Sequence, residues 1–179
     1  MVVVANTSKT IIRIAHSSVV NWETIKANFP IGEKINENTY VFDGSIFKKG
    51  QTRLFLAALP FYVCDELAKE AAKRAGGVHK VKRIETAEHL LFRKYCESPD
   101  SDMYIFLPQD VGIRVLHLLD NLPNAAHYIS NNPNHRESEF MRIYDKSTKH
   151  AVLLDDGMDL DWLLPFFDNA KIIPISQPL

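Results

Sequence analysis

Residues 54–77 read LFLAALPFYVCDELAKEAAKRAGG and give the clearest indication of the fold class. Its first six residues are continuously apolar, which is typical of a strand buried on both faces, and Pro60 ends the run. The segment Phe61–Ala75 then carries apolar and alanine residues at helical spacing, with acidic residues early and basic residues late. Gly76-Gly77 is expected to end this helix, because glycine readily adopts the left-handed conformation found at helix C-termini. A buried strand followed directly by an amphipathic helix predicts an α/β protein.

The flanking segments extend this pattern. Two β-type runs, Val2–Ala5 and Thr10–Ala15, are separated by AsnThrSerLys and predict a hairpin. The stretch around Trp22 is poorly periodic and predicts no regular element, and the next strand is expected to end in the turn Asp43-Gly44. The remaining elements expected in the first half are strands at 39–42 and 78–84 and a helix at 86–95.

The hexamer at 97–102 is the most polar and turn-prone part of the chain. It predicts a boundary between two small lobes, 1–98 and 102–179. The second half reads as a meander of three strands followed by alternating helices and strands, and so predicts a mixed sheet with flanking helices. The expected strands are 103–107, 111–119, 124–129, 151–154 and 171–175, and the expected helices are 135–146 and 158–167.

The composition mainly excludes classes of function. The 179 residues are 46% hydrophobic and carry a net charge of -1, so no concentrated basic surface is available for nucleic acid or for an anionic membrane. Cys64 and Cys96 lack the spacing of a zinc site or a disulfide framework. No signal peptide and no long apolar segment is present, which predicts a soluble cytoplasmic protein that does not insert into a membrane.

The order of strands and helices resembles the ribonuclease H-like fold of actin-like ATPases, with the first half as a rougher copy of the second. The likeness is most specific at LFLAALP, CDELAKEAAKRAGG and VKRIETAEHLLFR, within residues 54–93. This block is similar to the actin-like components of type IV pilus and type II secretion assembly platforms. By topology the resemblance extends to about residue 175.

The resemblance implies nucleotide-binding loops with a metal-organising Asp and phosphate-facing glycines. The first loop here, Asn6-Thr7-Ser8-Lys9, has neither Asp nor Gly. The second contains Gln109, Asp110 and Gly112 with Asp and Gly displaced, and the third reads Asp155-Asp156-Gly157, with two negative charges that would repel phosphate. The sequence therefore disfavours ATP and Mg²⁺ as cofactors. The candidate ligand-binding residues are Asn6, Ser8, Lys9, Gln109, Asp110, Gly112, Asp156 and Gly157.

The only dense carboxylate cluster comprises Asp155, Asp156, Asp159 and Asp161. Such a cluster could bind Mg²⁺ or Ca²⁺ at the end of a strand. The favoured interpretation is that Asp156 or Gly157 caps the following helix, with Asp159 interacting with the helix dipole.

Other candidate groups have structural interpretations. His117 and His127 are expected to form a polar pair on a solvated face of a hairpin, and Cys64 to be buried and inert. The aromatic residues of 162–167 are expected mainly in the core. The basic residues between 69 and 94 are expected on solvated helix faces and an edge strand, where Glu66, Glu70, Glu85 and Glu88 balance them.

These patterns favour a non-catalytic actin-like scaffold or assembly protein that works by binding a protein partner or itself, in a pilus or secretion platform if the resemblance holds. Two alternatives remain. One is a metal-dependent phosphohydrolase or nuclease using Asp110, Asp155 and Asp156. The other is a sensor that binds a small ligand in a cleft between the lobes, lined by Asn6, Ser8, Lys9 and Gln109.

Overall fold

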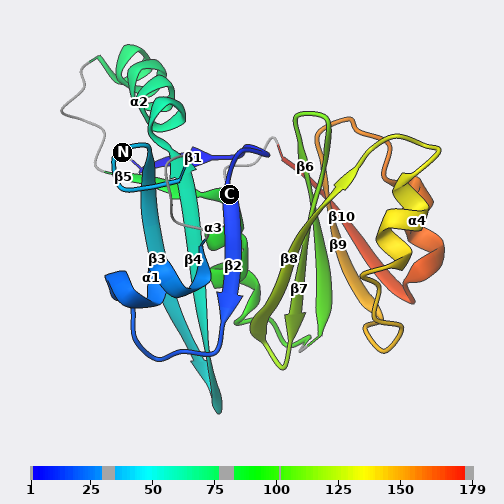
Figure 1. The fold of residues 1–179 in the computed structure, drawn as a ribbon. Helices are drawn as coiled ribbons and strands as arrows, with labels where there is room; N and C mark the ends of the chain where they lie inside the picture. The colour runs from blue at the N-terminus through cyan, green and yellow to red at the C-terminus, as the bar shows by residue number, and fades with distance from the viewer. Residues whose placement is uncertain (1, 30–34, 77–82, 101, 176–179) are drawn as a thin grey trace. The chain divides into compact units, whose positions relative to one another are not determined.

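The computed structural model describes residues 2–29, 35–76, 83–100 and 102–175 and divides into two compact units, Met1–Leu90 and Leu91–Leu179 (Figure 1). The break falls inside a helix, ahead of the polar hexamer at 97–102. Within the described residues, no helix is both long and apolar enough to cross a membrane. The elements of the first unit, the last of which continues into the second, are β1 (Val2–Ala5), β2 (Ile11–Ala15), α1 (Trp22–Asn28), β3 (Tyr40–Lys49), β4 (Gln51–Pro60), α2 (Phe61–Ala75), β5 (Arg83–Thr86) and α3 (Ala87–Tyr95).

The strands of the first unit form two separate sheets. β1 pairs in parallel with β5, and β4 lies between β2 and β3 in an antiparallel sheet. The prediction of a buried strand ending at Pro60 is confirmed, because residues 54–60 of β4 are all buried. Leu54, Leu56 and Ala58 pack with Phe29, which follows α1, in a small apolar cluster.

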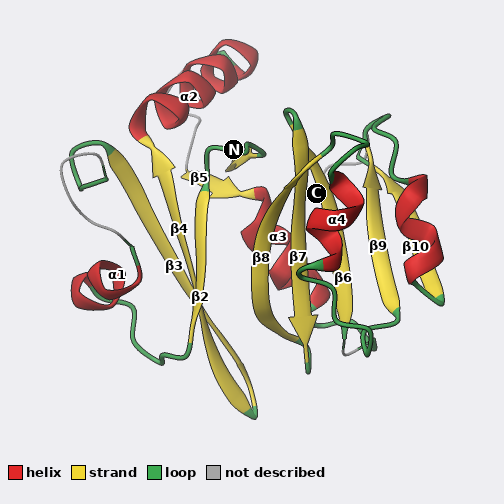
Figure 2. Cartoon of the chain, turned by 45° about the vertical axis from the view of Figure 1, so that its right-hand side comes forward, coloured by secondary structure: helices red, strands yellow, loops and turns green. Residues whose placement is uncertain are grey.

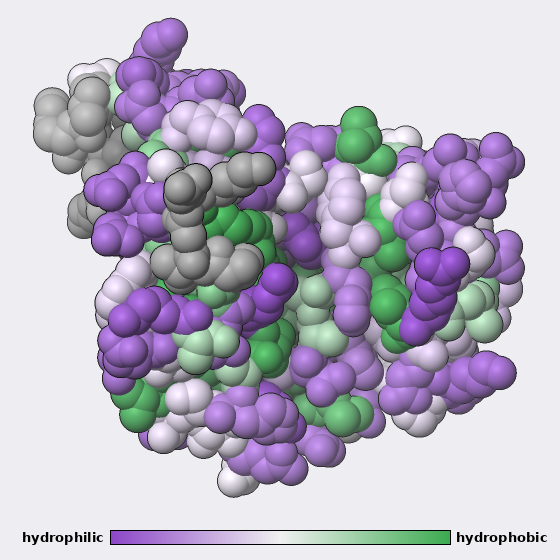
Figure 3. Space-filling view, viewed as in Figure 1, coloured by the Kyte–Doolittle hydropathy of each residue, from purple (hydrophilic) through white to green (hydrophobic). Residues whose placement is uncertain are grey.

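Helix α2 has the predicted bounds and the predicted end. Gly76 adopts a left-handed conformation (φ 73°), and its N–H donates to the carbonyl of Ala72. Val63 and Leu67 pack in a cluster with Ala5 of β1, while the opposite face of the helix is charged. The surface over α2 is accordingly mostly hydrophilic (Figure 3).

Three expectations for the first unit are wrong. β1 and β2 form no hairpin, since Val2 pairs with Arg83 and Ile11 pairs with Ala58. β3 continues through Asp43-Gly44 for ten residues and turns only at Gly50 (φ 73°). The stretch around Trp22 forms α1, which begins where Asn21 Oδ1 accepts from Thr24 N at 2.8 Å. Of the strand expected at 78–84, residues 78–82 lie outside the described residues.

The second unit contains one five-stranded mixed sheet in the order β10-β9-β6-β7-β8, and α4 lies against it (Figure 2). β6, β7 and β8 form the predicted antiparallel meander, and β9 and β10 run parallel to β6. The fold class is therefore the predicted one, a mixed sheet with flanking helices in a ribonuclease H-like order. The elements of this unit are β6 (Met103–Gln109), β7 (Gly112–Leu119), β8 (Leu122–Ser130), α4 (Arg136–Met141), β9 (His150–Asp155), the 3₁₀ helix η2 (Asp161–Phe166) and β10 (Asn169–Pro174).

The core of the second unit is aromatic. Phe140 of α4 is fully buried, and its ring lies 5.9 Å from Tyr104 and 5.5 Å from Phe106, measured between ring centroids. Phe167 packs in the same cluster, and Trp162 and Phe166 pack against it. The expectation that the aromatic residues of 162–167 lie mainly in the core is confirmed.

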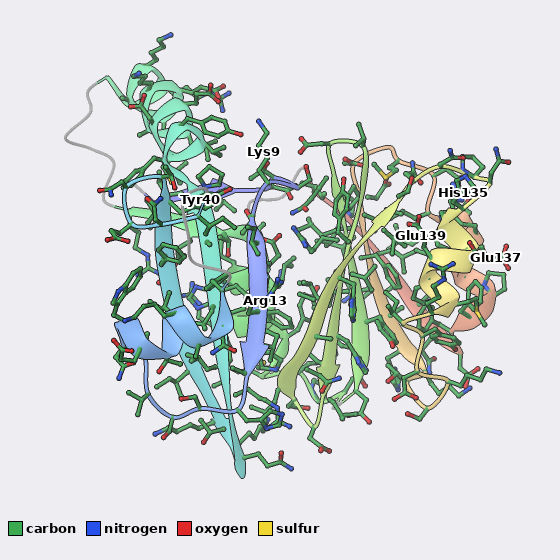
Figure 4. All side chains as sticks on the ribbon, in the orientation of Figure 1. Lys9, Arg13, Tyr40, His135, Glu137 and Glu139 are labelled. Carbon is green, nitrogen blue, oxygen red and sulfur yellow. The ribbon has the colours of Figure 1, made fainter. Side chains whose placement is uncertain are left out.

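Two helices of this unit differ from the predicted ones. α4 ends at Met141 instead of 146, because Tyr104 Oη donates to the carbonyl of Ile143 and accepts from Asp145 N at 2.8 Å. The helix expected at 158–167 is the 3₁₀ helix η2, which contains Pro165. Glu139 of α4 (labelled in Figure 4) bonds to the end of strand β8, since its Oε2 accepts from Ser130 N at 2.7 Å.

Candidate functional site

Gln109, Asp110 and Gly112 lie at the tight turn between β6 and β7. Gln109 pairs with Gly112, so only Asp110 and Val111 form the connection, and Asp110 adopts a positive φ of 43°. Gln109 is buried at 2% exposure, whereas the Val111 side chain is 81% exposed. The turn therefore presents an apolar residue and a carboxylate at its tip.

Gly112 is required by packing inside the sheet. A Cβ at this position would lie 2.5 Å from the carbonyl oxygen of Ile129 and 2.5 Å from the hydroxyl of Tyr128. Both atoms belong to the neighbouring strand β8. The absence of a side chain thus has a structural cause that involves no phosphate.

The carboxylates after β9 organise their own loop. Asp155 Oδ1 accepts from Gly157 N at 2.8 Å, and Asp156 Oδ1 accepts from Met158 N at 3.0 Å. Gly157 has a φ of 96°, which favours glycine. Asp159 pairs with Arg136 at 2.9 Å, and this contact together with the N–H of Asp161 lowers the pKa of Asp159.

The expected capping role is wrong. The helix that follows begins only at Asp161, and its N-cap is Leu160, whose side chain makes no capping bond. The part of the expectation that concerns Asp159 agrees with the structure, because Asp159 Oδ1 accepts from Asp161 N at 3.2 Å, at the start of this helix. Asp156 and Gly157 lie several residues earlier, in turns of their own.

The two loops of the second unit share one edge of the sheet. β6 and β9 are parallel neighbours, with Phe106 opposite Leu153, so their carboxyl ends lie at the same edge. The structure thus brings the turn at 109–112 and the loop at 155–157 to that edge. Among the described residues, no three His, Cys, Asp or Glu side chains are grouped so as to hold a metal ion. A hydrolase site built on Asp110, Asp155 and Asp156 stays a prediction.

The loop between β1 and β2 lies in the first unit. Thr7 closes it, since its carbonyl accepts from Thr10 N at 3.3 Å and its Oγ1 accepts from Lys9 N at 3.2 Å. The Lys9 ammonium lies 5.0 Å from the centre of the Tyr62 ring at the start of α2, and Figure 4 labels Lys9 on this loop. That Asn6, Ser8 and Lys9 line one cleft with the residues of the second unit stays a prediction.

The expectation of a solvated histidine pair is wrong for His117. Its side chain is buried and stacks on Tyr104 at 4.3 Å between ring centroids. Nδ1 accepts from the amide of Asn124 at 3.1 Å, and Nε2 donates to Thr148 Oγ1 at 3.0 Å. Burial lowers the pKa of His117, against the opposing effect of Asp145. His117 is a structural residue on the core face, and its position at a turn gave no signal of that.

The expectation for the basic residues holds only in part. Lys69 pairs with Asp65, and Arg74 pairs with Glu70, on the exposed face of α2. Glu85 pairs with Arg83 as expected, but Glu85 and Glu88 are only 3% and 0% exposed and do not lie on a solvated face.

Cys64 lies at the edge of a core. It packs against the cluster of Ala5, Leu59 and Val63, and it is partly buried. Burial raises the pKa of the Cys64 thiol, which disfavours the nucleophilic thiolate.

Comparison with solved structures shows that the fold of this chain is similar to the actin-like ATPase fold. A Bacteroides thetaiotaomicron protein with an actin-like ATPase fold and unknown function superposes with a TM-score of 0.57 and 8% identity, over 96% of this chain and 66% of that chain. The PilM-PilN type IV pilus biogenesis complex superposes with a TM-score of 0.59 and 14% identity, over 97% of this chain and 68% of that chain.

This chain thus spans about two thirds of the length of each of these structures. No protein-family model and no curated protein matches it. At these identities the likeness shows the fold alone, which is the actin-like ATPase fold.

Proposed function

We propose that this protein is an actin-like assembly factor that acts on the cytoplasmic side by binding a protein partner and does not hydrolyse ATP. The proposal rests mainly on one observation: the candidate nucleotide-binding residues of the second unit already have structural roles in their own loops and sheet. Asp155 and Asp156 accept hydrogen bonds from backbone N–H groups of their own loop. Gly112 leaves space for the neighbouring strand β8, with which any side chain would collide. Two carboxylates repel a triphosphate, and in the described part of the chain no three His, Cys, Asp or Glu side chains are grouped so that a metal ion could offset that charge.

The exposed apolar residues of the first unit support association. Four large side chains lie on or beside the face of β3 that α1 partly covers, and we call them the α1–β3 patch. Val20 lies against Gly44 of β3, so closely that a Cβ added at Gly44 would be 2.8 Å from the Val20 side chain. Contiguous exposed apolar surface is typical of protein-binding sites. The patch comprises Val19, Val20, Trp22 and Ile46, which are 50%, 40%, 38% and 38% exposed.

The PilM-PilN structure supports a role in pilus assembly, because a protein of this fold is there part of a complex named for type IV pilus biogenesis. By analogy, the partner of this chain is a PilN-type protein of a pilus or secretion platform. The residues Asn6, Ser8, Lys9 and Gln109 remain candidates for contacting such a partner or a small ligand.

The test combines nucleotide binding with partner binding. Thermal unfolding in millimolar ATP and Mg²⁺ should leave the midpoint unchanged, since a ligand stabilises only in proportion to its occupancy of the folded state. Co-expression with a PilN-type protein from the same genome should give a complex that co-elutes in gel filtration. Trp22→Asp combined with Ile46→Asp should abolish that complex, while Val111→Asp, at an exposed apolar site in the second unit, should retain it.

A midpoint that rises by several degrees with Mg²⁺ and ATP, or measurable phosphate release, would contradict the non-catalytic half of the proposal. Failure of the PilN-type protein to co-elute would contradict the assembly half.

A further inference from the structure

β10 is an open edge of the sheet in the second unit. It lies at one end of the order β10-β9-β6-β7-β8, and no other strand of the described ranges pairs with its outer side. Five of its six residues are exposed, and Ile172 is exposed at 50%. Open edges template the addition of another strand unless charge or proline blocks them. Here the strand carries one charge, Lys171, and its only proline is the last residue, Pro174.

The pairing with β9 determines which backbone groups face outward. Ile175 N donates to the carbonyl of Asp155 at 2.9 Å, and Pro174 lies opposite Asp155 in the parallel register. In a parallel pair, alternate residues bond to the neighbouring strand. Residues 169, 171 and 173 therefore bond to β9, and Ala170, Ile172 and Pro174 direct their backbone groups outward. The outward donors are the N–H groups of Ala170 and Ile172.

We propose that a second copy of this chain pairs with β10 in an antiparallel arrangement, with the two-fold axis at Ile172. In this register, Ile172 N–H of each copy donates to the Ile172 carbonyl of the other. Ala170 N–H donates to the Pro174 carbonyl of the second copy. Pro174 has no N–H, so it leaves no donor unpaired at this position. Every outward donor is then satisfied.

The side chains favour the same register. Lys171 lies opposite Ile173 of the second copy, so its aliphatic stem has an apolar neighbour and the two ammonium groups stay apart. One neighbouring register, with the axis at Lys171, places two lysines directly opposite each other, which is destabilising. The two Ile172 side chains meet on the face where a cavity of about 90 Å³ opens beside Ile172, Leu153 and Met158. Asp155 and Asp161 also line this cavity, so pairing would cover a region that is apolar beside Ile172 and charged at its rim.

This inference needs only the edge of one sheet and is independent of the proposed function. It is tested first on the whole chain by light scattering during gel filtration, which should report a dimer whose fraction rises with concentration. Ile172→Pro removes an outward N–H and leaves the bonds to β9 intact, as proline requires on an edge. It should weaken dimerisation about 10- to 100-fold, because two central hydrogen bonds of the pair are lost. Circular dichroism should show an unchanged fold.

Cross-linking tests the register. With the axis at Ile172, the two Cα atoms of Ile172 lie about 5.5 Å apart, within disulfide range. The two Cα atoms of Lys171 lie about 8 Å apart, beyond that range. Ile172→Cys should therefore form a covalent dimer under mild oxidation and Lys171→Cys should not, with wild type as the control for Cys64 and Cys96. A monomer at all concentrations, or cross-linking by Lys171→Cys in place of Ile172→Cys, would overturn the proposal.

Discussion

The second unit holds its five described strands in one sheet, whereas the first unit divides its five described strands between two sheets. The cores differ in the same way. In the second unit, aromatic rings from α4 and from η2 and its C-cap pack on the sheet as one large cluster. Among the described residues of the first unit, two smaller clusters form, one centred on Phe29 and another on Val63.

The difference follows from the distance along the chain between partners. β6, β7 and β8 pair with their neighbours in sequence, so tight turns set their register. β1 instead pairs with β5, so that Val2 lies opposite Arg83. Because these two strands are far apart in the sequence, their pairing depends on tertiary contacts and not on a local turn. We therefore expect substitutions in the second unit to cost more stability than matched ones in the first.

The largest contrast is expected in the cores. Phe140→Ala should lower the free energy of unfolding by about 4 kcal/mol, because it leaves a cavity among several aromatic rings. Phe140 is fully buried and contacts Tyr104, Phe106 and Phe167. Phe29→Ala in the first unit should cost about 3 kcal/mol, at the lower end for a buried phenylalanine, since fewer buried residues surround it. Urea denaturation measures both, and equal losses would contradict the contrast.

The second prediction compares glycines. Gly112→Ala should cost about 3 kcal/mol, because the new Cβ collides with the backbone of Ile129. Gly50→Ala, at the turn between β3 and β4, should cost only about 1 kcal/mol, since φ is positive but nothing lies within 4 Å of a Cβ there.

Thermal unfolding of each glycine variant gives the comparison. If Gly112 instead served a ligand and not the sheet, Gly112→Ala would keep its stability, and that outcome would contradict its structural assignment.

The contrast between local strand pairing in the second unit and long-range pairing in the first also explains which parts of the fold could be predicted from the sequence. The meander from residue 103 and the helix at 61–75 were predictable because hydrophobic period and turn residues are local signals. The pairing of β2 with β4 was not, because adjacency in sequence favoured a hairpin. Helix α1 was missed because it is only seven residues long and its apolar face is narrow: Trp22 contacts Phe42 and Ile25 packs against the Phe29 cluster, but neither is fully buried.

The candidate site shows the same limit. The sequence located the loops at 109–112 and 155–157, and parallel pairing of β6 and β9 brings them to one edge. It could not assign Gly112, because the clash that requires glycine comes from Ile129 and Tyr128 on another strand. It also placed His117 in solvent, since burial by Thr148 and Tyr104 depends on distant segments.

A smaller effect is expected from pH, and it should act on the second unit. Burial lowers the pKa of His117 and of His127, so the unfolded chain binds protons at a higher pH than the folded chain does. The stabilisation is complete above the ordinary histidine pKa of about 6.5 and is lost as the pH falls through the lowered values. The free energy of unfolding should therefore decrease from pH 7 to pH 5.

Urea denaturation across that range measures the slope. His117→Gln should be less stable at pH 7 and should show a shallower decrease, and an unchanged slope would contradict the assignment to His117. The carboxyl of Asp145, whose pKa is lowered by hydrogen bonds from Ser147, acts in a separate window below about pH 4.

The smallest contrast compares two helical arginines. Arg136 of α4 lies over the Trp162 ring at 5.0 Å and its side chain is only 14% exposed, whereas Arg74 of α2 is 78% exposed beside Glu70. Arg136→Met should cost about 1 kcal/mol through the lost ring contact, and Arg74→Met should cost a few tenths of a kcal/mol. Since salt screens exposed pairs, molar salt should remove the effect of Arg74→Met and leave most of that of Arg136→Met. Equal salt sensitivity would mean that Arg136 acts through its ion pair with Asp159 and not through its contact with the Trp162 ring.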